Sequence, residues 1–179
     1  MRVASRVSAA LLAALWLGSL LAWPHLPARI PTHFGFSGKA DSWAETTLLS
    51  WFGLPLLALA IVLLNVVLAR QLPRRPGLFN LSDKQRFLAL PSEYQAPVIR
   101  RMQDFLHWVS AQMVLLFGLV QWAIYRTAQG ADTRTYMLFI LILSVAVLPV
   151  LLLWSSSSVE AEIARQFRRF QQQVSPEPA

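Results

Sequence analysis

The sequence predicts an all-α membrane protein with four membrane-spanning helices, and three observations support this. The 179-residue chain is 55% hydrophobic and only 14% charged, whereas soluble domains carry about 25% charged residues. Its mean hydropathy is positive, at +0.46. Four stretches without Asp, Glu, Lys or Arg are each long enough to cross a hydrocarbon core, which takes about 17–25 helical residues. These stretches are 7–23, 48–69, 105–125 and 136–154.

The composition also excludes several classes of protein. Helices in a soluble core need only one apolar stripe, so helices that are apolar all round indicate a bilayer. The spans use up most of the apolar residues, which leaves one membrane domain over 1–157, a tail over 158–179 and no soluble core. The chain has no cysteine, which excludes disulfides, thiolate metal sites and cysteine nucleophiles.

The distribution of Lys and Arg predicts the orientation. Of the 16 basic residues, the four in the segments 24–47 and 126–135 are Arg29, Lys39, Arg126 and Arg134. The other twelve lie at the amino end, between the second and third spans, or in the tail. The positive-inside rule then places both termini and the 70–104 segment in the cytoplasm. The net charge of +7 faces anionic headgroups rather than nucleic acid.

The first span also resembles a cleaved signal peptide, because Arg2 and Arg6 precede an apolar stretch. Its end, at 20–24, lacks a small-x-small cleavage site, so we expect the span to be retained. Aromatic residues near the predicted ends of the spans form the belt typical of retained spans. The outer set is Trp23, Trp43, Trp51, Trp122, Tyr125 and Tyr136, and the inner set is Trp108 and Trp154.

The four spans are predicted to form two antiparallel helical hairpins, and the outer loop, 24–47, is predicted to be an ordered cap over them. Pro24, Pro27 and Pro31 fix φ and hold the chain extended. The sequence from Ser42 to Glu45 fits a capping box and predicts a helix that starts there and continues into the second span.

The cytoplasmic segment and the tail carry further capping signals. Boxes at 82–85 and 92–95 predict a short amphipathic helix and a helix that continues into the third span. Apolar side chains there are expected on the inner membrane face, namely Phe79, Leu81, Phe87, Leu88 and Leu90. A box from Ser157 to Glu160 predicts a separate tail helix. Its apolar stripe indicates an interfacial helix on an anionic leaflet, or a helix on a partner protein. The stripe is Val159, Ile163, Phe167, Phe170 and Val174.

Few polar side chains fall within the spans. Asn65 lies in the second span, and the third span has His107, Ser110, Gly118 and Gln121 on one face and Gln112 on the other. Ionisable groups inside a membrane usually mark proton or ion pathways, but His107 alone qualifies and lies near the cytoplasmic end. We therefore expect this stripe to join helix to helix by hydrogen bonds.

The outer loop holds the candidates for chemistry. His25, His33, Asp41 and Glu45 could bind zinc or act as acid and base, but their spacing matches no helix-based metal motif. The alternatives are structural: Asp41 and Glu45 cap the next helix, and His33 anchors the loop. His25, His33 and Asp41 remain weak metal candidates. No nucleophile elbow, phosphate-binding loop or carboxylate pair is found, so we expect no catalytic residue and no cofactor.

Two stretches resemble a known bacterial family. Residues 26–43 read LPARIPTHFGFSGKADSW and resemble the signature of the domain of unknown function 1648 family, which also occurs in SdpI-like immunity proteins. A second stretch resembles the cytoplasmic segment of such proteins, through Asn80, Lys84, Phe87 and Leu90. Gly35 stands where the family often has Asn or Asp, and Thr46 where a basic residue is common, so ligand contacts are not carried over to these two positions.

The resemblance implies a non-enzymatic envelope protein whose outer loop binds a peptide, lipid or partner, in an immunity or sensor role. The expected binding residues are Pro31, His33, Phe34, Gly38, Asp41 and Trp43. A small transporter or accessory subunit of a membrane complex is the alternative, and a periplasmic metal-dependent enzyme is the third.

Overall fold

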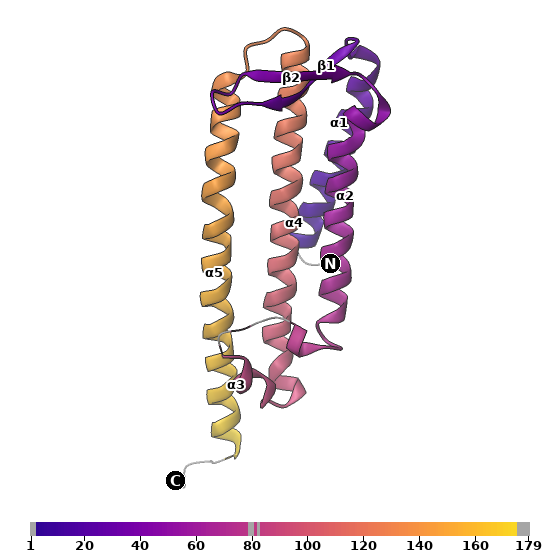
Figure 1. The fold of residues 1–179 in the computed structure, drawn as a ribbon. Coiled ribbons are helices and arrows are strands. Elements are labelled where there is room, and N and C mark those ends of the chain that lie inside the picture. The colour runs from indigo at the N-terminus through magenta and orange to yellow at the C-terminus, as the bar shows by residue number, and fades with distance from the viewer. Residues whose placement is uncertain (1–2, 79–80, 82, 175–179) are drawn as a thin grey trace.

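The computed structural model describes residues 3–78, 81 and 83–174. Four long helices dominate it (Figure 1): α1 (Val3–Ala22), α2 (Leu48–Gln71), α4 (Ser92–Ala128) and α5 (Arg134–Val174). Each is long and apolar enough to cross a membrane. Together with the composition, this confirms a multi-pass membrane protein with four candidate spans.

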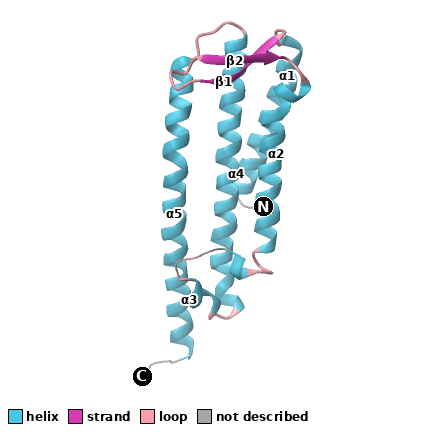
Figure 2. Cartoon of the chain, in the orientation of Figure 1, coloured by secondary structure: helices cyan, strands magenta, loops and turns pink. Residues whose placement is uncertain are grey.

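Shorter elements connect the helices (Figure 2). A 3-10 turn, η1 (Trp23–His25), leads into two strands, β1 (Arg29–Phe34) and β2 (Ala40–Glu45). At the opposite end of the bundle lie η2 (Pro76–Leu78) and a one-turn helix, α3 (Lys84–Leu88). We call the end with the strands the hairpin end and the end with α3 the basic end.

Helix α4 is the centre of the bundle and contacts α1, α2 and α5. Two polar pairs fix it to α2. Asn65 Nδ2 donates to Ser110 Oγ at 3.0 Å, and Gln121 Nε2 donates to the carbonyl of Trp51 at 2.9 Å. The polar groups predicted to join helices therefore do so in these two pairs.

The predicted start of α2 is wrong. Residues 42–45 lie in β2, where they pair with β1, instead of forming a capping box. The helix begins at Leu48, and Thr47 is its N-cap: the Thr47 hydroxyl accepts from the backbone N–H of Ser50, whose own hydroxyl accepts from the Thr47 N–H. Pairing with β1 satisfies the backbone hydrogen-bonding groups of residues 42–45, so α2 starts after these residues.

The basic end is a packed core rather than a membrane-facing surface. Helix α4 runs unbroken from Ser92 through the third span, as predicted, although Ser82, Phe79 and Asn80 lie outside the described residues. Phe87 and Leu90 are buried, so their expected place on the inner membrane face is wrong. The cluster around Phe87 consists of Ala69, Leu72, Phe87, Val98, Ile99, Met102, Leu106, Val159 and Ile163.

The expected separate tail helix is also wrong, because α5 continues through the predicted capping box. Ser157 Oγ donates to the carbonyl of Trp154, three residues earlier, so the serine extends the turn instead of capping a new one. Val159 and Ile163 are buried in the basic-end core, Phe167 lies under the Arg86 guanidinium, and Phe170 meets the Tyr94 ring edge-on. The first four residues of the stripe thus pack on the same chain, whereas Val174 is exposed.

A buried carboxylate joins α5 to α4 at this end. Glu162 Oε2 accepts from Arg101 Nε at 2.9 Å and lies 3.0 Å from Arg165 Nη2, while Glu162 Oε1 accepts from Gln166 Nε2 at 2.7 Å. Burial by itself raises the pKa of Glu162. The hydrogen bonds from Gln166 and Arg101 and the two guanidinium charges outweigh burial, so its pKa lies below the ordinary value.

Candidate binding face at the hairpin end

The two strands form an antiparallel hairpin that lies across the end of the bundle, from α1 and α2 towards α5 (Figure 1). Ile30 fixes its inner side, in a cluster with Trp51, Phe52 and Ile124. Trp51 was expected in the outer aromatic belt, but it is buried inside this cluster. The apolar inner side makes the hairpin a rigid platform, and it leaves the other side exposed.

The tip of the hairpin requires glycine. Gly35 N–H donates to the carbonyl of Lys39, and Gly38 N–H donates to the carbonyl of Gly35. Gly38 has a φ of +74°, and a Cβ there would lie 2.6 Å from the carbonyl oxygen of Arg134. Glycine at this position therefore lets the tip rest on the first residue of α5. A Cβ at Gly35 would approach Asp41 Oδ2 to 2.9 Å, so glycine there leaves room for the Asp41 carboxylate.

His33 and Asp41 form an exposed pair across the two strands. His33 Nδ1 lies 2.6 Å from Asp41 Oδ1, and the side chains are 68% and 52% exposed. The strand register shifts on both sides of His33, and such a bulge re-aims a side chain. Asp41 lies in β2 and does not cap α2, so the expectation of a cap is wrong.

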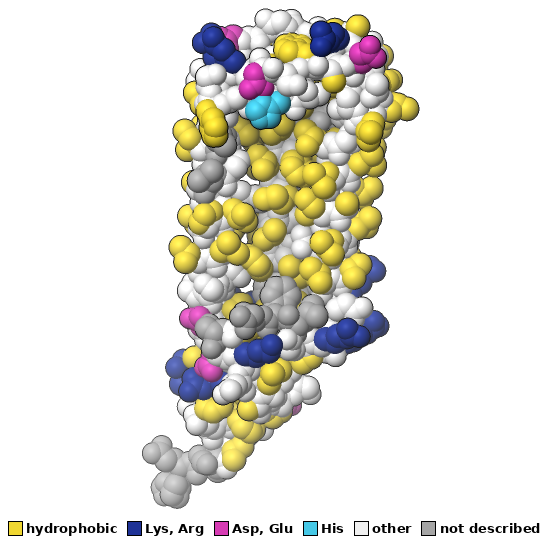
Figure 3. Space-filling model, in the orientation of Figure 1, with side chains coloured by type: hydrophobic (Ala, Val, Ile, Leu, Met, Phe, Trp, Pro, Cys, Tyr) yellow, Lys and Arg dark blue, Asp and Glu magenta, His cyan; other side chains and the backbone are white. Residues whose placement is uncertain are grey.

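Exposed aromatic side chains flank this pair. Phe36, at the tip, is 95% exposed, and Trp43 in β2 is also exposed. Arg29 Nη2 donates to the carbonyl of Trp43 at 3.1 Å and ties the two strands together. Figure 3 shows charged side chains of both signs at this end, above a broad band of hydrophobic ones. The hairpin end therefore presents exposed aromatic, acidic and basic groups together.

The residues predicted for binding divide into two sets. His33, Asp41 and Trp43 are exposed, whereas Pro31 is buried, Phe34 is half-buried and Gly38 shapes the tip. The predicted site is thus a contact face of three residues with three supporting residues below it. We name His33, Asp41, Trp43 and the exposed Phe36 the hairpin face.

Of the three weak metal candidates, His33 and Asp41 are in contact, but His25 does not complete a three-ligand group with them. His25 lies in η1, where its carbonyl accepts from Gln129 Nε2 at 2.6 Å. Within residues 3–78, 81 and 83–174, no three His, Cys, Asp or Glu side chains form a group able to hold a metal ion. The family-like residues Lys84, Phe87 and Leu90 lie at the basic end, where the last two are core, and Asn80 lies outside the described residues.

The structure adds groups that the sequence analysis did not single out. Asp132 precedes α5 at the hairpin end and pairs with Arg134, its Oδ2 lying 3.0 Å from Arg134 Nη2. The backbone N–H of Arg134, followed by its guanidinium, lowers the pKa of Asp132. Ser19 and Gly18 in α1 also line a cavity with α4. In the sequence, these groups could have been found from the Asp-x-Arg spacing of Asp132 and Arg134 and from the adjacent small residues Gly18 and Ser19.

The match to known families falls on the hairpin. Residues 10–59 match the family model described as Domain of unknown function (DUF1648). The chain carries a DUF1648 domain. It comprises most of α1, the whole hairpin and the first half of α2. Neither a curated protein nor a solved structure matches the chain. The matched segment therefore contains the hairpin face, and the family model assigns no function to that segment.

Proposed function

We propose that this DUF1648 protein is a non-enzymatic protein of the bacterial inner membrane that binds a peptide on its hairpin face. The Lys and Arg distribution supports an orientation in which the hairpin end is outside and both termini are inside. A peptide reaching the membrane from outside then meets the hairpin face first. An immunity or sensing role of the SdpI-like kind fits this arrangement.

The observation that carries the proposal is the exposed His33–Asp41 pair on a rigid support. Loop stability alone gives this pair little purpose, because exposed ion pairs contribute about 0–1 kcal/mol. Phe36 and Trp43, in the same hairpin, are exposed as well. Large aromatic surfaces next to polar groups are enriched where proteins recognise one another.

The alternatives have less support. A transporter needs polar groups that face a pathway, whereas Asn65, Ser110 and the Gln121 amide nitrogen are engaged between helices. A periplasmic metal-dependent enzyme needs three or more ligands together, and within the described residues no three His, Cys, Asp or Glu side chains form such a group. Peptide binding needs only the exposed side chains of the hairpin face in the positions that the structure gives them.

The test is selection from a random peptide display library against the full chain in lipid nanodiscs, with empty nanodiscs as background. We expect enriched peptides that bind the wild-type protein and lose at least about tenfold in affinity on His33→Ala and Asp41→Ala, as for hot-spot residues. Asp41→Asn keeps the shape of the side chain and removes its charge, so it measures the electrostatic part.

Asp132→Ala is the matched control, because it removes an exposed carboxylate from the same end of the bundle but not from the hairpin. It should leave peptide affinity unchanged. Enriched peptides that bind His33→Ala and Asp41→Ala as well as they bind the wild type would overturn the proposal. So would a selection that enriches nothing over empty nanodiscs.

A further inference from the structure

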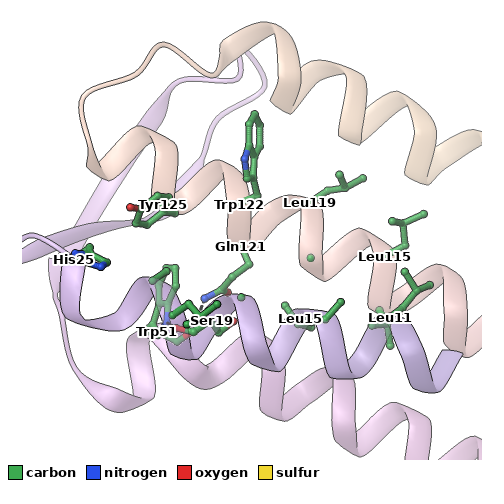
Figure 4. A pocket seen from close by; sticks show the side chains of 16 residues that line it. Leu11, Leu15, Ser19, His25, Trp51, Leu115, Leu119, Gln121, Trp122 and Tyr125 are labelled. Carbon is green, nitrogen blue, oxygen red and sulfur yellow. Dashed lines mark hydrogen bonds between the residues drawn. The ribbon is translucent and has the colours of Figure 1, made fainter. Parts of the chain in front are cut away.

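A cavity of about 490 Å³ lies between α1 and α4, in the half of the bundle nearest the hairpin end (Figure 4). Its lining is apolar over most of its length, from Leu11 and Leu15 to Trp122. Side chains at its rim, including Leu21, Leu115 and Trp122, are exposed on the apolar sides of spanning helices. The cavity therefore opens towards the hydrocarbon of the bilayer. Its size is that of a small-molecule site.

Two glycines, one from each helix, leave this space open. A Cβ built on Gly18 of α1 or on Gly118 of α4 meets nothing within 4 Å. Both glycines line the cavity. Larger side chains at these positions would fill the cavity without a backbone clash, so its volume depends on the two glycines.

Two buried polar atoms without a hydrogen-bond partner belong to residues that line the cavity. Ser19 is 2% exposed and Gln121 is 5% exposed, yet Ser19 Oγ and Gln121 Oε1 are both unpartnered. Most buried polar groups in proteins have a hydrogen-bond partner, so a buried polar atom without one needs an explanation. Both residues line the cavity, and Figure 4 shows their side chains close to Trp51.

Neighbouring hydrogen bonds hold these two residues in place. Trp51 Nε1 donates to the carbonyl of Ser19 at 2.9 Å, and Gln121 Nε2 donates to the carbonyl of Trp51 at 2.9 Å. The amide of Gln121 is thereby oriented with its oxygen as the free acceptor. The hydroxyl of Ser19 both donates and accepts. A ligand hydroxyl would satisfy both atoms.

We propose that the cavity binds a membrane lipid that carries a free hydroxyl at its glycerol end, with an acyl chain along the apolar lining. Trp122 and Tyr125 belong to the set of aromatics expected at the membrane interface, and they line the same end of the cavity as Gln121. Lipid glycerol groups lie at that level of a bilayer. The hydroxyl donates to Gln121 Oε1 and accepts from Ser19 Oγ.

Lipid fits these observations better than a second copy of the chain. A docked helix needs a continuous stripe along the whole helix, whereas this cavity is lined in α1 only from Leu11 to Ala22 and has a volume of about 490 Å³. Its orphaned polar atoms also lie at one end, as they would for a molecule with one polar head. The inference uses none of the hairpin face residues and does not depend on the proposed function.

The test is native mass spectrometry of the full chain released from detergent micelles after incubation with 1,2-dioleoylglycerol or with its O-methyl ether. The ether keeps both acyl chains and cannot donate a hydrogen bond. We expect dioleoylglycerol to bind about fivefold tighter than the ether, the scale of one net hydrogen bond. Ser19→Ala and Gln121→Leu should each reduce that preference towards one.

Gly18→Leu combined with Gly118→Leu should abolish binding of both lipids by filling the cavity. Gly53→Leu is the matched control, since Gly53 lies in α2, does not line the cavity, and also has space for a Cβ. It should bind like the wild type.

Equal binding of dioleoylglycerol and the ether by the wild type would overturn the assignment of the hydroxyl. Unchanged binding by the doubly substituted Gly18→Leu, Gly118→Leu protein would overturn the site. A wild-type dimer that only this double substitution dissociates would assign the cavity to a second copy of the chain instead. Loss of the hydroxyl preference in Ser19→Ala, a small change at a buried position, separates loss of the contact from loss of the fold.

Discussion

The two ends of the bundle use polar groups in opposite ways. At the basic end, the Glu162 carboxylate is buried between α4 and α5 and is satisfied by Arg101, Arg165 and Gln166. At the hairpin end, His33 and Asp41 meet each other in an exposed position. Among the described residues, the apolar cluster at the basic end has nine buried members, whereas the cluster that contains Ile30 of the hairpin has four.

This difference separates a structural end from an exposed one. Buried charges hold helices in register and are costly to change singly, so the basic end fixes the relation of α5 to α4. Exposed groups on a supported hairpin can be changed at little cost in stability. Substitutions should therefore act on stability at one end and on binding at the other.

The largest effect on stability is expected for Phe87→Ala. Phe87 is fully buried in the basic-end core, and removing a buried phenylalanine costs about 3–5 kcal/mol. Denaturant unfolding of the full chain in micelles measures this loss. Leu88→Ala is the control, because Leu88 is the next residue in α3 and is exposed. A loss in Leu88→Ala as large as in Phe87→Ala would show that the two ends are not distinguished by packing.

A smaller, local effect is expected for Gly38→Ala at the hairpin tip. The φ of +74° costs an alanine about 1–2 kcal/mol, and its Cβ would collide with the Arg134 backbone. Gly130→Ala is the matched control, since Gly130 has a φ of +86° but space around it. Hydrogen exchange over β1 and β2 should rise in Gly38→Ala and stay near the wild-type rate in Gly130→Ala. Equal exchange in the two variants would show that the tip does not rest on α5.

The smallest of the three effects is a pH dependence at the basic end. The pKa of Glu162 is lowered from an ordinary value of 4.5, so its carboxylate stabilises the fold above that value. This contribution is lost as the pH falls through 4.5 towards the lower pKa of the folded state. The midpoint of thermal unfolding should fall between pH 7 and pH 4 by more in the wild type than in Glu162→Gln. Glu93→Gln, at an exposed position at the start of α4, should behave like the wild type.

The four spans were predictable because each is a long run without charge, and the bilayer imposes that pattern directly. The start of α2 was not, because the Ser42–Glu45 pattern satisfies a local capping rule that strand pairing with β1 overrides. The tail was placed on the leaflet for a related reason. An apolar stripe does not specify which apolar surface covers it, and here that surface is the chain's own α3 and α4.

The hairpin residues were predictable as a group but not in their roles. Sequence spacing pointed to His33 and Asp41, and the structure brings them together through a bulged register that the spacing does not reveal. Exposed Phe36 was overlooked, since one aromatic in a loop carries no periodic signal. The orphaned Ser19 and Gln121 atoms depend on the packing of α1 against α4, which lies outside what either helix shows alone.

The most direct test of this account is the position of the two ends across the membrane. The chain has no cysteine, so labelling of a single introduced cysteine reports the accessibility of that position alone. Ser37→Cys lies on the exposed hairpin tip and Ser92→Cys at the exposed start of α4. With a membrane-impermeant maleimide, Ser37→Cys should be labelled once the outer membrane is permeabilised, and Ser92→Cys only after the inner membrane is also disrupted. Labelling of Ser92→Cys while the inner membrane is intact, or protection of Ser37→Cys, would contradict the outward-facing hairpin.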